Sequence, residues 1–321
     1  MRFALMIEPQ MGLTYEEQLA VARRAEAAGF EAFLRSDHYD AFPGATDQPT
    51  TDAWTVIAGL ARETSTIRLG VLVSPVLFRQ PGQLAKLVVT ADEMSGGRIE
   101  VGVGAGWHEH EHRGHGFGWP EIAERADRLE ETLEILHGLW EGPDGWSFLG
   151  TYYAVEDAFF RPRPGSLPAR AGGRPRIITG SSGSPRGYRI AARWSDEFNL
   201  SSTSPDGAVA RLAALDEACR AIGRDPATLV HSVMSGLLIG RDEAEVASRG
   251  AELMTVFGSG DEESETWFAA RRPRWVYGTP EEARTVVRAF AAVGVERLVL
   301  QDFLPRDLDL IDLAAEVLFD A

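Results

Sequence analysis

Eight short runs of apolar residues recur along the chain, and each is followed by a longer segment in which apolar positions return every three or four residues. The short runs are continuous rather than alternating, which is typical of strands that are buried on both faces of a parallel sheet. They lie at Phe3–Ile7, Ala32–Arg35, Arg68–Ser74, Ile99–Gly104, Arg176–Thr179, Glu197–Leu200, Leu229–Ile239 and Arg297–Gln301.

The intervening segments have the period of helices that pack against a sheet. The clearest one begins at Thr14, where Glu17 completes a capping box, and ends at Gly29. The others cover Ala53–Glu63, Gly82–Met94, Glu121–Trp140, Arg186–Ala192, Gly207–Ile222, Glu243–Val256 and Pro280–Val293. Eight strand–helix units in series predict an α/β fold, a closed (β/α)8 TIM barrel that forms a single domain over residues 1–321. A doubly wound open sheet is the competing arrangement.

Two segments do not fit this repeat. Residues 142–173 are rich in Gly, Pro and aromatic residues and predict a hairpin followed by a loop, whereas residues 257–275 contain the polar run GSGDEESE. Long loops inside a compact domain are uncommon and are often functional. We therefore expect both segments to be insertions at the carboxyl-terminal face of the barrel, with the first one overhanging its mouth.

Composition narrows the classes of partner. The chain has 321 residues, of which 44% are hydrophobic and 25% charged, and its formal charge is −16. Because such a chain repels phosphate backbones, we expect no nucleic-acid partner. The single cysteine, Cys219, cannot form a disulfide within the chain, which predicts a cytoplasmic protein. The first residues lack the pattern of a signal peptide, and no apolar stretch reaches 18 residues, so we expect no membrane association.

The catalytic groups of a barrel lie where its strands end, and Ser36-Asp37-His38 follows the second strand. A histidine can donate or accept a proton near neutral pH because its ordinary pKa is about 6.5. His38 is therefore the candidate acid or base. The alternative is a histidine that only caps a loop.

A second candidate is the loop Gly180-Ser-Ser-Gly-Ser184, which follows the fifth strand and precedes a helix with Pro185 near its start. Small residues let backbone N–H groups approach an anion, the serine hydroxyls donate hydrogen bonds, and a helix N-terminus adds partial positive charge. The loop predicts a phosphate site, with Arg186 as a further candidate. An ordinary polar loop is the alternative.

Two motifs around the fourth strand resemble known signatures without matching them fully. Gly102, Gly104 and Gly106 resemble a dinucleotide fingerprint but lack its third glycine at the required spacing. We expect them instead to let a flat ring lie close to the backbone. The run HEHEH at 108–112 matches the H-E-x-x-H motif of zinc proteases, but its polar intervening residues favour a loop at the barrel mouth and no catalytic metal. Fortuitous metal binding by the cluster from His108 to His115 is left open.

Taken together, several ordered motifs resemble the luciferase-like monooxygenase superfamily, and within it the oxidoreductases that use coenzyme F420. The similarity runs from residue 1 to about 200 and continues weakly to the end. The motifs that carry it are SDH (36–38), GVLVSPVLFRQP (70–81), DEMSGGRIEVGVGAGWHEHEH (92–112), ERADRLEETLEIL (124–136) and PRIITGSSGSPRGYRIAARWSDEFN (175–199).

The resemblance implies a barrel with a flavin-type ring at its mouth. It places His38 near the reactive part of the ring. It places a bulge of the third strand, often with a non-proline cis peptide, against the ring, and the glycine-serine loop against the phosphate. The cofactor-binding residues that it implies are Asp37, His38, Leu72, Val73, Ser74, Ala105, Gly106, Gly180, Ser181, Ser182, Gly183 and Ser184.

One departure concerns the substrate. The sugar-6-phosphate dehydrogenases of this family carry a glutamate where Trp107 stands. Lys86 is the only lysine of the chain, which argues against the cationic sugar-phosphate pocket of those enzymes and also indicates a GC-rich bacterial gene. We therefore expect an apolar or aromatic substrate that contacts Trp107 beneath the 142–173 insertion.

The resemblance implies hydride transfer between reduced coenzyme F420 and a small organic substrate, with His38 as the catalytic residue. The alternative on the same scaffold is a two-component monooxygenase that uses FMN and O2, and a non-catalytic flavin-binding protein is a third possibility. We expect a homo-oligomer, a dimer, whose partner is a small-molecule substrate.

Overall fold

Eight parallel strands close into a barrel in the computed structural model, which describes residues 1–166 and 173–320. Around the barrel the order is β9-β11-β1-β2-β3-β4-β7-β8, and β8 pairs again with β9. The strands are β1 (Arg2–Ile7), β2 (Ala32–Arg35), β3 (Arg68–Pro75), β4 (Ile99–Gly104), β7 (Arg176–Ser181), β8 (Glu197–Ser201), β9 (Val230–Ile239) and β11 (Arg297–Asp302). The predicted closed barrel is confirmed, and the open sheet is excluded.

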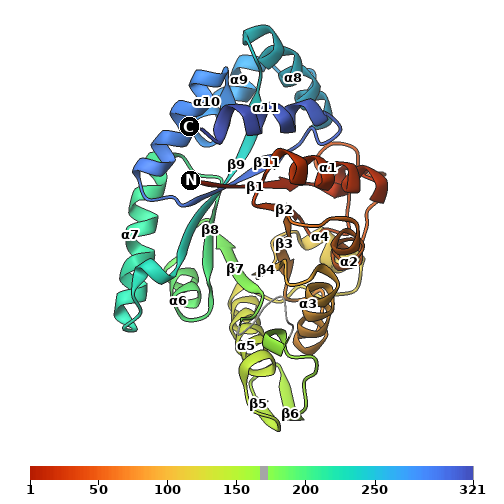
Figure 1. Cartoon of the computed structure of the whole chain (residues 1–321), viewed down its shortest axis with the longest axis vertical. Helices are drawn as coiled ribbons and strands as arrows, with labels where there is room; N and C mark the ends of the chain where they lie inside the picture. The colour runs from red at the N-terminus through yellow and green to blue at the C-terminus, as the bar shows by residue number, and fades with distance from the viewer. Residues whose placement is uncertain (167–172, 321) are drawn as a thin grey trace.

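Helices surround the strands on all sides (Figure 1). They are α1 (Tyr15–Ala28), α2 (Ala53–Glu63), α3 (Pro81–Ser95), α5 (Ile122–Glu141), α6 (Pro185–Trp194), α7 (Pro205–Ala221), α8 (Glu243–Val256), α10 (Pro280–Ala292) and α11 (Leu308–Leu318). The capping box predicted for α1 is present, because the Thr14 hydroxyl accepts from the Glu17 N–H and the Glu17 carboxylate accepts from the Thr14 N–H. The helix α11 was not predicted.

The apolar side chains form two separate cores. The larger one lies between the strands and the helices, where residues such as Phe33, Trp54 and Phe290 are almost fully buried. The smaller one fills the barrel itself with Ala4, Met6, Ala32, Leu34, Leu72, Ile178 and Val299. Since the barrel interior is packed, chemistry is confined to its ends.

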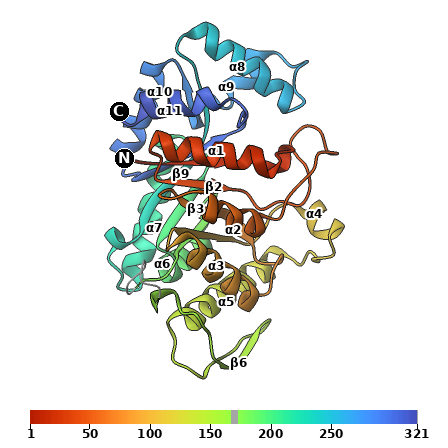
Figure 2. The same ribbon diagram turned by 45° about the vertical axis from the view of Figure 1, so that its right-hand side comes forward.

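The segment 142–173 does contain the predicted hairpin, formed by β5 (Trp146–Leu149) and β6 (Ala154–Ala158). Its described residues do not line the cavity at the mouth. Because α5 runs antiparallel to the strands, the segment that follows it starts at their amino ends, and the hairpin lies beyond α5 (Figures 1 and 2). Beyond the hairpin, Lys86 of α3 donates to the carbonyl of Arg161 at 2.6 Å. The hairpin therefore does not overhang the mouth. For the insertion as a whole the expectation stays a prediction, since residues 167–172 lie outside the described residues.

The segment 257–275 leaves α8 at the mouth, where Phe257 faces the central cavity. It continues through α9 (Ser264–Ala269) to β10 (Val276–Gly278), which pairs in parallel with the end of β9. The short helix α4 (Glu109–Gly114) follows β4 at the same end of the barrel (Figure 2). Among the described residues, no helix is both long and apolar enough to cross a bilayer.

Candidate active site at the barrel mouth

A cavity of about 710 Å³ opens where the strands end, within the usual size range of a small-molecule site. Nine of the predicted site residues line it: His38, Leu72, Val73, Ala105, Gly106, Trp107, Gly180, Ser181 and Ser182. Most of the lining is apolar, with additional surface from Met6, Phe42, Ile122, Met234, Phe257 and Phe303. No lysine or arginine is among the described residues that line it.

His38 is held by a carboxylate from a distant part of the chain. Its Nδ1 lies 2.9 Å from Glu111 Oε1, and Glu111 Oε2 accepts from the Tyr39 N–H at 3.0 Å. Both side chains are buried, Glu111 almost completely. Burial acts to raise the pKa of Glu111, but the hydrogen bond and charge of His38 outweigh it, so that this pKa lies below its ordinary value. Glu111 thus fixes the ring orientation and leaves Nε2 as the nitrogen available to the cavity.

Two aromatic rings stand beside His38 at the entrance. Phe42 and Trp107 both contact its imidazole edge-on, with centroids 4.6 and 5.7 Å from it. Trp107 keeps 65% of its surface exposed although it lines the cavity. An exposed tryptophan in this place offers an apolar surface to a bound molecule.

The third strand carries the expected irregularity. Its register to β4 shifts between Val71 and Ser74, and the Leu72–Val73 peptide is cis. Gly102 and Gly104 of β4 make room for it, since a Cβ atom on either would come within 2.9 Å of the Val73 side chain. These glycines therefore accommodate the neighbouring strand, and Gly104 also lines the cavity together with Gly106.

The side chains of Asp37 and Ser74 point away from the cavity. The Asp37 carboxylate accepts from Arg79 at 2.5 Å, and Arg79 also pairs with Asp52. Ser74 accepts from the Trp54 indole at 2.9 Å. These two side chains thus secure the barrel wall, while their neighbours His38 and Val73 line the cavity. Contact of Asp37 and Ser74 with a cofactor stays a prediction.

The glycine-serine loop has the geometry of an anion cradle. Gly183 has φ +96°, and the Ser184 hydroxyl caps α6 by accepting from the Gly187 N–H. The remaining first-turn N–H groups have no partner within the helix. Gly183 and Ser184 lie beyond the cavity lining, at its edge. Arg186 does not assist, because Asp127 and Glu130 engage its guanidinium.

A cation that the sequence did not indicate lies next to this loop. Arg211 of α7 approaches within 3.5 Å of the position that a Cβ on Gly183 would occupy. Its charge lowers the pKa of Tyr188, although burial raises that pKa overall. Among the described residues Arg211 makes no recorded ion pair. It is therefore available to an anion on the loop, and no local motif could have revealed it.

The opposite side of the cavity is polar. Glu8 accepts from Gln10 at 2.8 Å and from Gln301, and Gln10 in turn accepts from the Ser36 hydroxyl at 2.8 Å. The network joins the ends of β1, β2 and β11. It gives one side of an otherwise apolar cavity hydrogen-bonding groups in fixed positions.

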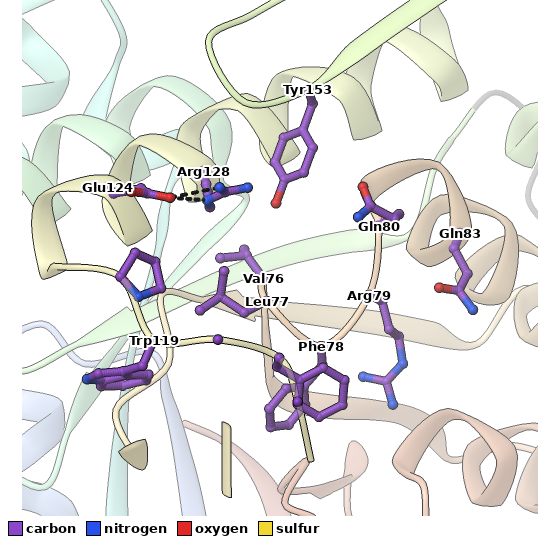
Figure 3. Close-up of a pocket in the computed structure, with 14 residues that line it drawn as sticks. Val76, Leu77, Phe78, Arg79, Gln80, Gln83, Trp119, Glu124, Arg128 and Tyr153 are labelled. Atoms are coloured by element: carbon purple, nitrogen blue, oxygen red, sulfur yellow. Dashed lines mark hydrogen bonds and ion pairs between the residues drawn. The ribbon is translucent and has the colours of Figure 1, made fainter. Parts of the chain in front are cut away.

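A second hollow of about 630 Å³ lies beside the mouth, between the start of α3, residues 116–120 and α5. Figure 3 shows Tyr153 of the hairpin segment above it, with Glu124 and Arg128 paired along one wall. None of the described residues of the 142–173 segment lines the central cavity. A substrate beneath this insertion stays a prediction.

The structure separates the two outer histidines of the HEHEH run. His112 is fully buried, and its Nδ1 lies 2.8 Å from the carbonyl of His108. Among the described residues, the side chains that converge as possible metal ligands are Asp40, His108 and His110, and His112 is not one of them.

The profile of the luciferase-like monooxygenase family matches residues 1–303. The chain belongs to this family. An FMNH2-dependent dimethylsulfone monooxygenase from Pseudomonas fluorescens (strain Pf0-1) is 31% identical over 326 residues, which cover 91% of this chain and 83% of that protein. An F420-dependent glucose-6-phosphate dehydrogenase from Microbacterium testaceum (strain StLB037) is 32% identical over 206 residues, 62% of this chain and 57% of that protein.

Among solved structures, an F420-dependent secondary alcohol dehydrogenase in complex with an F420-acetone adduct has a TM-score of 0.81. It is 20% identical, and the match covers 99% of this chain and 98% of that one. At this identity the likeness shows the barrel alone. The luciferase-like family thus contains both FMNH2-dependent and F420-dependent enzymes that act on small molecules.

Proposed function

We propose that this protein is an oxidoreductase that transfers a hydride between coenzyme F420 and a small apolar or aromatic substrate at the barrel mouth. The observation that carries the proposal is the His38–Glu111 pair, a buried and oriented acid–base group on the wall of an apolar cavity. Hydride transfer to or from a carbon–oxygen bond requires a proton at the oxygen, and such a pair can handle that proton.

The cavity fits a flat cofactor with an anionic tail. Leu72 and Val73 would support one face of the ring, and the loop from Gly180 to Ser184, with Arg211 beside it, would hold the phosphate. When bound, the reduced deazaflavin supplies the hydride.

The chain's own residues perform the remaining tasks. With Nδ1 engaged by Glu111, His38 can hold or accept a proton only at Nε2. Phe42 and Trp107, which contact the His38 ring, offer apolar contacts to a substrate. Glu8, Gln10 and Gln301 provide polar contacts on the opposite side.

A second candidate function is an FMNH2-dependent monooxygenase. The observation that favours it is coverage, because the dimethylsulfone monooxygenases align over nine tenths of this chain, whereas the F420-dependent relative aligns over 62%. In that case the same cavity would hold FMN, and O2 would enter past Trp107.

The two functions are separated by titrating the apo-protein with F420 and with FMN, each oxidised and reduced, while following tryptophan fluorescence. We expect F420 to bind at least about tenfold more tightly, a difference of about 1.4 kcal/mol. Anaerobic turnover of reduced F420 with ketones and enones should then oxidise the coenzyme. Tighter FMN binding, together with product formation that requires O2, would overturn the first proposal in favour of the second.

A further inference from the structure

At the outer lip of the mouth, three histidines surround one carboxylate. Asp40 lies in the loop after β2, and His108, His110 and His115 belong to α4 and its two ends. His110 Nδ1 is 2.5 Å from Asp40 Oδ2, His115 Nε2 is 3.2 Å from Oδ1, and His108 Nε2 is 3.9 Å from Oδ2. The ligand atoms of Asp40, His108 and His110 all lie within 4.8 Å of one another.

This cluster is not explained by the surrounding charges. Asp40 is only 19% exposed, and its recorded ion-pair partners among the described residues are these imidazoles rather than an arginine. Three of the seven histidines of the chain thus lie around one carboxylate. None of the three contacts the cavity, so the proposed reaction does not use them.

The donor set is suited to a transition metal. Zn–N and Zn–O bonds of about 2.0–2.2 Å place tetrahedral ligand atoms about 3.3 Å apart. To close around an ion, the 2.5 Å contact between His110 and Asp40 would open, and the longer distances within the 4.8 Å cluster would shorten. Imidazole nitrogens favour Zn²⁺, Ni²⁺, Co²⁺ and Cu²⁺ over Mg²⁺ and Ca²⁺, which prefer oxygen ligands.

We propose that Asp40, His108 and His110 form a binding site for a divalent transition-metal ion of the Zn²⁺ or Ni²⁺ class, with His115 holding the other oxygen of Asp40. The site differs from the zinc-protease motif, because it uses alternate residues of the HEHEH run together with a carboxylate 70 residues away from His110. It is independent of whether F420 or FMN is the cofactor.

The ion would link the two loops that carry the proposed active site. Asp40 lies two residues after His38, and the His108 ring contacts Phe42 and Trp107 with centroid distances of 4.5 and 5.1 Å. Metal occupancy therefore joins the β2 loop to α4 and fixes the aromatic side of the entrance. The ion acts as a structural clamp on the mouth and takes no part in redox chemistry.

The test uses untagged full-length protein that has been stripped with EDTA and dialysed. Calorimetric titration with Zn²⁺ and with Ni²⁺ should show one ion per chain, Co²⁺ should give the visible bands of a nitrogen-coordinated ion, and Mg²⁺ should not compete. The melting temperature should rise with Zn²⁺ concentration, since a ligand that binds only the folded state stabilises it.

The decisive variant is H110A/H115A, which removes two side chains that are 85% and 43% exposed and so should preserve the fold. Loss of a group that merely orients a ligand weakens metal affinity about 10–100-fold, so loss of the ligand His110 together with His115, which orients Asp40, should weaken Zn²⁺ binding at least that much. The matched control is H137A/H231A, which alters two histidines that pair with Glu141 and Asp216. Binding of several weak ions, or equal loss of binding in both double variants, would overturn the proposal.

Discussion

Charged groups are buried at both ends of this barrel, and they are arranged in opposite ways. At the amino ends of the strands, Arg297 is fully buried and lies 2.8 Å from Glu100 and 3.0 Å from Glu197. Arg68 and Arg176 add further cations to Glu100. These arginines outweigh the effect of burial and lower the pKa of Glu100 to about 2. Each carboxylate therefore has cations around it, and the cluster closes one end of the barrel.

At the carboxyl ends, two buried acidic groups have no arginine ion pair among the described residues, although Asp37 is paired with Arg79 there. Glu111 pairs with His38, and the other side of the His38 ring borders a cavity. Asp302, at the end of β11, is fully buried, and burial raises its pKa to about 7. One end of the barrel thus stabilises the fold, while the other presents the His38–Glu111 pair to a cavity. Variants at the two ends should separate activity from stability.

The largest effect is expected at the mouth. His38→Ala removes the proposed acid–base group and should lower kcat about 10²–10⁴-fold, while the dissociation constant of the coenzyme changes less than about tenfold. Steady-state kinetics and fluorescence titration measure the two quantities. Glu111→Gln should keep the ring in place and lower kcat less. Equal loss of binding and turnover in His38→Ala would instead make His38 a cofactor-positioning residue.

The matching change at the amino end should affect stability instead. Arg297→Met leaves Glu100 and Glu197 buried with less compensation and should lower the free energy of unfolding by about 3–5 kcal/mol. Urea denaturation measures this change. Arg241→Met is the control, because Arg241 and its partner Asp309 are both about half exposed and solvent screens such pairs, so that they contribute little to stability. A similar loss in both variants would contradict the distinction between the two ends.

The raised pKa of Asp302 predicts a pH-dependent stability of definite sign. The folded state favours the protonated form of Asp302. The contribution of this group to the free energy of unfolding is therefore full below pH 3.8 and is lost as the pH rises toward about 7. Asp302→Asn should therefore gain about 2 kcal/mol relative to the wild type between pH 5 and pH 8, as measured by urea denaturation at both values. Asp309→Asn is the control, because the pKa of Asp309 is lowered to about 2, so that its carboxyl group does not titrate between pH 5 and pH 8. An unchanged pH profile in Asp302→Asn would show that the carboxyl is ionised in the folded protein.

The smallest effect concerns the anion cradle at the edge of the mouth. Gly183→Val introduces a β-branched residue at φ +96°, and Arg211→Met removes the unpaired cation. Each should weaken coenzyme binding about tenfold, about 1.4 kcal/mol, without a comparable loss of stability in Arg211→Met. Arg189→Met, an exposed change on α6, serves as the control. Unchanged affinity in both variants would remove the phosphate from this loop.

Local signals account for the parts of the site that could be predicted. His38 and the loop from Gly180 to Ser184 were found because barrel strands end in functional residues and because glycine and serine before a helix favour anions. Glu111 and Arg211 could not be found in this way. Glu111 meets His38 across 73 positions of the chain, and Arg211 reaches the loop from the next helix. The direction of Asp37 and Ser74 also required the structure, because a strand end of three residues does not show which side chain faces inward.

The sequence by itself determined the barrel, because continuous apolar strands and amphipathic helices each follow from a repeat of a few residues, and eight such units allow few alternatives. It also determined the cap of α1. Only the tertiary structure decided that the hairpin lies away from the mouth and that Val73 occupies the space beside Gly102 and Gly104. It also decided where the side chains of the HEHEH run lie: some contact His38 or Asp40, and His112 is buried in the core. These outcomes depend on contacts between residues far apart in the chain, and such contacts are selected by packing and charge pairing in the folded state rather than by local preference.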